Sequence, residues 1–162
     1  MRLLMTAIVI ALSATAGLAQ QPAAAPAAEA LQMFQTSADV AAIVARLKAQ
    51  PAQPLRSAPL FSMPPYRVNI EYRTAVAPAA IHETEAELFT VIDGSGTFVI
   101  GGQLTEPTRQ NPQNLQGKSI TGGTSRKVSK GDFMLVPAGS PHGFSSVDGT
   151  ITLMSLHLPI QK

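Results

Sequence analysis

The feature that most constrains the fold is a series of short, alternating segments between Tyr66 and Pro159. Four apolar residues alternate with four polar ones in YRVNIEYR, residues 66–73, and this period of two is typical of a strand with one buried face. Turns rich in Gly and Pro separate further strand candidates, at 79–84, 87–92, 96–100, 125–128, 133–136, 142–146 and 150–158. Many short strands without an internal repeat predict one all-β sandwich or jelly-roll barrel over residues 66–159.

One segment of this region, residues 101–124, does not follow the pattern. It is polar, rich in Gly, Asn and Pro, and has no convincing period of two or of 3.6. Loops of this length without secondary structure are usually functional lids or disordered segments. We therefore expect a long loop inside the barrel domain, placed where it could cover the mouth of the barrel.

The residues before the barrel predict three consecutive parts. Residues 1–19 combine Arg2, an uncharged apolar run and a final Ala-Gly-Leu-Ala, which indicates a secretory signal peptide that is too short for a membrane span. Residues 20–36 begin with a Pro- and Ala-rich stretch, so we expect a disordered linker. Residues 37–50 place four apolar side chains on one helical stripe and predict a short amphipathic helix. The expected mature protein is periplasmic or secreted, with no stable membrane anchor.

The composition excludes several kinds of chemistry and several kinds of partner. The chain has no cysteine, so it forms no disulfide and offers no thiolate nucleophile or thiolate metal ligand. Twelve Lys and Arg residues against ten Asp and Glu residues give a net charge of +2, which provides no electrostatic reason to propose nucleic acid or an anionic membrane as a partner. The function must therefore be inferred from a local site.

The segment GDFMLVPAGSPH, from Gly131 to His142, carries a specific pattern of Gly, five residues, Pro, one residue, Gly, two residues and His. It resembles the second motif of the cupin superfamily at each of these positions, including a metal-binding His at its end. The first cupin motif is matched in part, because Glu87 and Gly94 keep its final spacing and His82 fits its second His. The chain thus resembles a small, single-domain, exported cupin of the bacterial type. This resemblance implies an all-β, cupin-type jelly-roll barrel with one short N-terminal helix.

The first motif departs from the cupin pattern at one ligand, and its register stays open. If His82 is the second His of the motif, the first His position falls on Ala80. If His82 is instead the first His, the second falls on Thr84, and only two residues then precede Glu87. The usual Asn four residues after the second-motif His is Ser146 here. In either register one of the four usual ligands is missing.

The residues themselves support a metal site at His82, Glu87 and His142. Each lies on a predicted strand, and if the faces that carry them point into the barrel, two imidazoles and one carboxylate converge among apolar walls. Two His and one carboxylate with open positions suit Fe(II), although Mn, Zn, Ni or Cu could also bind. The residues that share these faces, and are predicted to line the pocket, are Ala80, Thr84, Phe89, Val91, Met134, Phe144 and Ser146.

Three further ionisable residues are relevant beside this set, two because they are near it in the sequence and one because it is also a histidine. Glu85 is near enough in the sequence to replace Glu87, but we favour Glu87 as the ligand. Glu83 is expected to face outward. His157 lies in the run LMSLHL, with apolar neighbours on both faces, so we interpret it as a structural or interface His rather than a pocket residue.

A metal in such a site would bind and polarise an oxygen-rich small molecule. The expected function is therefore an exported single-domain cupin that binds a divalent metal and a small molecule, as a metal-dependent enzyme of oxygenase, isomerase or lyase type. The alternative is a non-catalytic small-molecule-binding or structural cupin with a degenerate metal site, which the missing ligand and Ser146 favour. A homodimer is compatible with the apolar helix stripe and with the apolar strand around His157. The fold alone does not choose among these functions.

Overall fold

The computed structural model describes residues 33–160, so the predicted signal peptide and most of the predicted linker lie outside the described residues. In the described part, one helix, α2 (Ser37–Ala49), precedes eleven strands. Within these residues, no helix has both the length and the hydropathy that a bilayer span requires. The strands are β1 (Leu55–Met63), β2 (Tyr66–Arg73), β3 (Ala79–His82), β4 (Glu85–Ile100), β5 (Gln103–Thr105), β6 (Thr108–Asn111), β7 (Asn114–Gly117), β8 (Ser119–Thr121), β9 (Thr124–Ser129), β10 (Phe133–Val136) and β11 (His142–Pro159).

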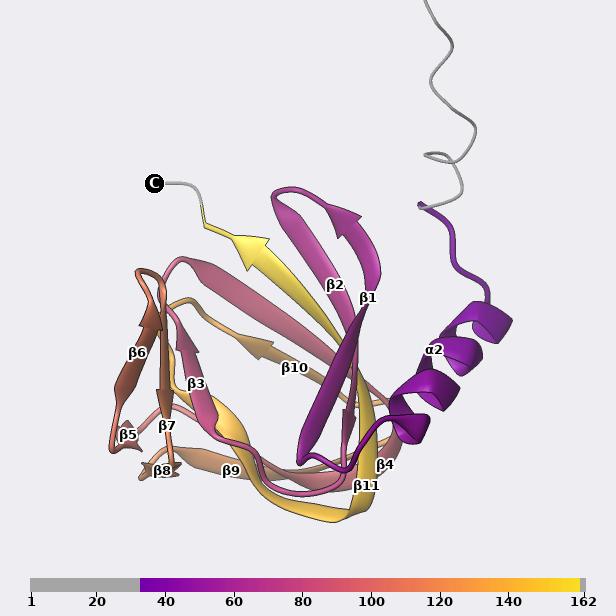
Figure 1. Cartoon of the computed structure of the whole chain (residues 1–162). Coiled ribbons are helices and arrows are strands. Elements are labelled where there is room, and N and C mark those ends of the chain that lie inside the picture. The colour runs from indigo at the N-terminus through magenta and orange to yellow at the C-terminus, as the bar shows by residue number, and fades with distance from the viewer. Residues whose placement is uncertain (1–32, 161–162) are drawn as a thin grey trace, which may run out of the picture.

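Nine of the strands belong to one antiparallel sheet that curls around a common interior (Figure 1). The long strand β11 is central to it, because β11 pairs with β2 on one side and with β4 along most of its length. The sheet continues from β11 through β3 and β7 to β6, while β4 also pairs with β9 and β10. This architecture confirms the predicted all-β jelly-roll with one short N-terminal helix.

Two turns predicted from the sequence lie inside continuous strands. The turns between the predicted strands, at 93–95 and 147–149, fall within β4 and β11, which pair with each other on both sides of these positions through shifts in register. Gly94 has a φ of 82°, and a Cβ at this position would collide with the carbonyl oxygen of Thr150 on the opposite strand. Glycine therefore bends the two long strands where the sequence suggested that they end.

The barrel also begins earlier than predicted, because β1 pairs with β2 from Leu55 onward. The helix α2 lies against the outside of this strand pair (Figure 1). Leu47, which is fully buried, packs with Ile43 of the helix and with Ile70 and Tyr72 of β2. Ile70 and Tyr72 of β2 therefore face the helix, whereas Glu71 and Arg73, which alternate with them, are buried on the opposite face.

The predicted helix over 37–50 is confirmed to within one residue at each end. It begins with a capping box in which Thr36 and Asp39 each bond to the backbone N–H of the other, so the N-cap is the residue directly before the predicted helix. At its other end, the buried Arg56 of β1 donates from Nη1 to the carbonyl oxygens of Leu47, at 3.0 Å, and Gln50, at 2.9 Å. The helix is thus fastened to the barrel at its C-terminus by a charged side chain.

The predicted long loop at 101–124 is wrong, because this segment contains four short strands. β5 and β8 form a separate two-stranded sheet, and β6 and β7 form a hairpin. All four residues of β7 pair with β3, which makes the hairpin part of the main sheet. The sequences TRQN and NLQG pair through their backbones and bury little of their side chains, so no alternation of apolar residues could reveal them.

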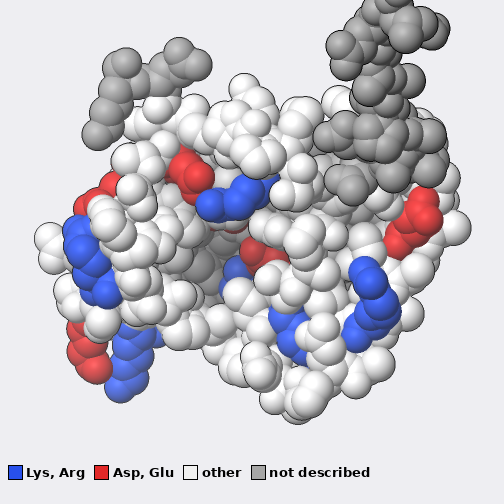
Figure 2. Space-filling model, turned by 45° about the horizontal axis from the view of Figure 1, so that its top comes forward, with Lys and Arg blue, Asp and Glu red and all other residues white. Residues whose placement is uncertain are grey.

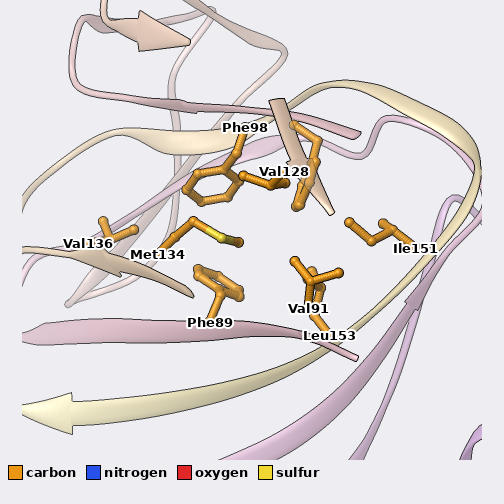
Figure 3. Packing of buried hydrophobic residues seen from close by; sticks show 9 residues of the cluster. Phe89, Val91, Phe98, Val128, Met134, Val136, Ile151 and Leu153 are labelled. Carbon is orange, nitrogen blue, oxygen red and sulfur yellow. The ribbon is translucent and has the colours of Figure 1, made fainter. Parts of the chain in front are cut away.

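An apolar core fills the barrel interior beside the candidate site (Figure 3). The rings of Phe89 and Phe98 lie 5.4 Å apart, with Met134 beside them, and the ring of Phe89 lies 6.0 Å from that of His142. Four residues predicted to line the pocket are part of this core, so they form an apolar wall rather than a polar binding surface. The buried members of the core are Phe89, Val91, Phe98, Val128, Met134, Val136, Phe144, Ile151 and Leu153.

Candidate metal centre

The three predicted metal ligands come from the ends of three strands. His82 is the last residue of β3, Glu87 lies near the start of β4, and His142 begins β11. His82 and His142 meet for two reasons. β11 pairs with β3 at His142 and Ala80. The turn before β11 also contacts β3, because the Gly139 N–H donates to the His82 carbonyl oxygen at 2.8 Å. The turn of the second motif therefore places His142 beside His82.

Glu87 lies at the centre of the cluster. Its Oε2 is 3.2 Å from His82 Nε2 and 3.1 Å from His142 Nε2, and the three ligand atoms all lie within 4.8 Å of one another. Glu87 is 3% exposed and His142 is 5% exposed, whereas the His82 side chain retains 19% exposure. The structure thus brings the predicted ligands together, with His82 on the more accessible side.

The other ring nitrogen of each of these two histidines also faces an oxygen. His142 Nδ1 lies 3.1 Å from the backbone carbonyl oxygen of Ser140, and His82 Nδ1 lies 2.7 Å from Asn114 Oδ1. A carbonyl oxygen only accepts hydrogen bonds, so Nδ1 of each ring is the donor. In a neutral imidazole, Nε2 then carries the lone pair and faces the ionised Glu87. The contact between this lone pair and the carboxylate oxygen is repulsive unless a proton or a metal cation lies between the two atoms.

The separations among these donor atoms fit a first-row metal ion. With bonds of about 2.1 Å, two adjacent ligand atoms lie about 3.0 Å apart in an octahedral site and about 3.4 Å apart in a tetrahedral one. The two distances from Glu87 Oε2, 3.1 and 3.2 Å, fall between these values. The donor set and its spacing therefore fit a divalent ion held by His82, Glu87 and His142.

A third imidazole, that of His157, lies in the same cluster. Its Nε2 is 3.2 Å from Glu87 Oε1, and its Nδ1 is 3.2 Å from Glu85 Oε2. The sequence predicted a structural or interface role, but the structure places this buried ring inside the barrel, where it contacts two carboxylates. His157 reaches this position because it is directly opposite Glu87 in the pairing of β11 with β4. Only that register, which is not visible in the sequence, connects the two residues.

The ionisation of the cluster follows from its burial and its pairing. Burial acts to raise the pKa of Glu87, but hydrogen bonding to His142 and His82 outweighs it and holds the pKa below the ordinary value of 4.5. Burial acts to lower the pKa of His82, but the bonds to Glu87 and Asn114 raise it above 6.5. Burial lowers the pKa of His157, with Glu87 opposing the effect. Glu87 is therefore an anion at neutral pH and supplies a negative charge that attracts a cation.

The remaining predicted site residues have varied surroundings. Ala80 lies on β3 opposite His142, whereas Thr84 lies between β3 and β4. If His82 is the second His of the motif, the missing first His position therefore falls within β3. Ser146, which was predicted to line the pocket, donates from Oγ to Thr97 Oγ1 at 2.9 Å within the sheet. Glu83 is exposed and paired with Arg109, which confirms its expected outward direction.

Of the three candidate ligands, His82 has the most exposed side chain, at 19%. β3 and β11 both end toward the top of Figure 1, and Figure 2, which turns this end toward the reader, shows a hollow with acidic and basic side chains in it. A separate cavity of about 170 Å³ contains none of the three metal-ligand candidates, and its lining includes Ala79, Val99 and Lys118.

Solved structures identify the architecture. The sequence matches no protein-family model and no curated protein. The cupin domain of Schizosaccharomyces pombe Cnp3 is 16% identical, with a TM-score of 0.50, over 70% of this chain and 72% of that one. The protein TT1209 from Thermus thermophilus is 14% identical, with a TM-score of 0.51, over 72% of this chain and 93% of that one. The Streptomyces nucleoside dehydratase Pac13 is 9% identical, with a TM-score of 0.48, over 67% and 72%. The chain has a cupin fold, as the sequence predicted.

Proposed function

We propose that this chain binds one divalent transition-metal ion through His82, Glu87 and His142, and that the bound ion holds a small, oxygen-rich molecule. The observation that carries the proposal is the environment of His142. Its Nδ1 donates to the carbonyl oxygen of Ser140, and its Nε2 faces the buried carboxylate of Glu87 at 3.1 Å. A cation between these two atoms removes the repulsion between their lone pairs, and Fe, Mn, Zn, Ni and Cu all accept such a donor set.

The surroundings of the cluster suit small-molecule chemistry. A bound ion supplies Lewis-acid polarisation of an oxygen-bearing ligand. The rings of Phe89 and Phe98 lie 6.0 and 6.3 Å from that of His142 and exclude water on the core side, while His82 stays partly open to solvent. A ligand therefore approaches from the side of His82. The catalytic form of this proposal is an oxygenase, isomerase or lyase, and the signal peptide predicted at 1–19 supports a periplasmic or secreted location.

One observation favours a second candidate, a non-catalytic binding or structural cupin without metal. Three imidazoles already lie within 3.2 Å of the Glu87 oxygens. Protons on these imidazoles would satisfy the carboxylate as well as a metal ion does. In that case the cluster is a buried group of ion pairs, and its role is to hold the strand ends together.

The experiment that tests the proposal is elemental analysis of the full-length gene product, purified from its native compartment without chelators or metal-affinity resin. We expect about one equivalent of a transition metal in the wild-type protein and little in Glu87→Gln, because the amide removes the anionic donor. Glu83→Gln is the matched control, since it makes the same change at an exposed carboxylate paired with Arg109. A metal-free wild-type protein that Glu87→Gln strongly destabilises would support the second candidate instead.

A further inference from the structure

We infer that His157 is a positioning residue of the proposed metal centre, which holds Glu87 Oε1 so that Oε2 faces His82 and His142. The inference rests on the proposed metal binding and extends it to a residue outside both cupin motifs. The argument begins with Glu87, whose two oxygens have different partners. His82 and His142 lie at Oε2, whereas His157 Nε2 lies 3.2 Å from Oε1.

A contact at Oε1 fixes the oxygen that a metal would use. The terminal torsion of a glutamate is broad, so a carboxylate held at neither oxygen samples many orientations. A donor at Oε1 restricts this rotation and leaves the lone pairs of Oε2 directed toward the two ligand imidazoles. Hydrogen bonds to the unused atoms of metal ligands commonly tune metal affinity in this way.

The other ring nitrogen of His157 faces a carboxylate near the barrel rim. This nitrogen, Nδ1, lies 3.2 Å from Glu85 Oε2, and the same oxygen accepts a hydrogen bond from Arg67 Nη2 at 2.7 Å. Arg67, His157 and Glu87 are direct neighbours across β2, β11 and β4, so the pairing of the three strands places them in one row. The chain of contacts therefore runs from the half-exposed Arg67 to the buried carboxylate.

The geometry also allows a different role, in which His157 is itself a ligand. Ligand atoms of His82, Glu85 and His157 lie within 4.8 Å of one another. However, the guanidinium of Arg67 already pairs with Glu85 Oε2, and its positive charge opposes a cation at that oxygen. Among the described residues, no Lys or Arg pairs in this way with the carboxylate of Glu87. We therefore assign His157 to positioning and not to ligation.

The test is a Co²⁺ titration of the full chain and its variants against a competing chelator, followed by the visible spectrum of each Co²⁺ form. We expect His157→Ala to weaken Co²⁺ binding by about 10- to 100-fold. The spectrum at saturation should keep the wild-type bands, because the ligands are unchanged. His157→Gln should recover part of the loss, since its amide can donate to Oε1. The matched control Glu83→Gln should leave binding unchanged, because it alters an exposed carboxylate paired with Arg109.

Two results would overturn the assignment. Binding of Co²⁺ by His157→Ala within about twofold of the wild-type affinity would show that the contact at Oε1 does not matter. Altered bands at saturation, with a loss well beyond about 100-fold, would make His157 a ligand instead. If the wild-type chain binds no Co²⁺, the proposed function itself fails, and this inference fails with it.

Discussion

Replacing Asn114 by Ala tests whether the segment at 101–124 is part of the site. Asn114 lies on β7, opposite His82 on β3, and its Oδ1 is 2.7 Å from His82 Nδ1. The change removes the acceptor that orients the imidazole and directs its Nε2 toward Glu87. Such orienting contacts are typically worth about 10- to 100-fold in metal affinity. Because the His82 side chain is 19% exposed, water can replace part of the contact, so we expect a loss near about 10-fold, or about 1.4 kcal/mol.

The assay is a Zn²⁺ competition titration, with thermal melting of the metal-free proteins alongside. Asn114→Asp should retain or tighten binding, because a carboxylate is a stronger acceptor for the Nδ1 proton. Asn111→Ala is the matched control, since it removes an exposed amide of the same hairpin whose Oδ1 accepts from the Gln113 N–H. The metal-free Asn114→Ala protein should lose only about 0.5–1.5 kcal/mol of stability. Equal Zn²⁺ affinities for the wild type, Asn114→Ala and Asn111→Ala would refute the reasoning.

Three further predictions concern the helix, the pH and the hairpin. Arg56→Gln should lower the unfolding free energy by about 2–4 kcal/mol in thermal melts, because the helix carbonyls at 47, 48 and 50 lose a charged donor. Arg46→Gln, on the exposed last turn, should change the unfolding free energy little. Equal losses for the two variants would contradict this prediction. Metal affinity should fall as the pH is lowered, and the fall should start above pH 6.5, because the raised pKa of His82 lets protons compete with the metal for its imidazole. Metal affinity that stays constant from about pH 8 to about pH 6 would contradict this prediction. Replacing residues 108–116 by a short linker should lower both the melting temperature and the metal affinity, because β7 pairs with β3 and supplies Asn114. An unchanged melting temperature and an unchanged metal affinity would show that the hairpin is dispensable.

The sequence was sufficient to predict the barrel and the three candidate ligands. The spacing from Gly131 to His142 encodes a turn, a short strand and a second turn, all of which depend on local conformation, and the structure has β10 and the start of β11 there. Glu87, Phe89 and Val91 alternate on β4, and all three are buried, as the period of two predicts. Local patterns of this kind can be recognised without knowledge of strand pairing.

What the sequence did not reveal depends on pairing between distant strands. His157 meets Glu87 only through the register of β11 against β4, which shifts at several irregular positions along their length. The hairpin of β6 and β7 is polar: β7 is defined by its backbone pairing with β3, and β6 by its pairing with β7, rather than by a buried face. The inward direction of Glu71 and Arg73 reflects the helix α2, which covers the apolar face of β2. No local pattern contains this information.

The location of a bound metal ion by anomalous X-ray scattering tests the central claim most directly. Crystals of the chain grown with Zn²⁺ or Co²⁺ should be measured on both sides of the absorption edge of the metal. We expect one anomalous peak about 2.1 Å from His82 Nε2, Glu87 Oε2 and His142 Nε2. A peak between Glu85 and His157, or the absence of a peak from the cluster at saturating metal, would contradict the proposed site.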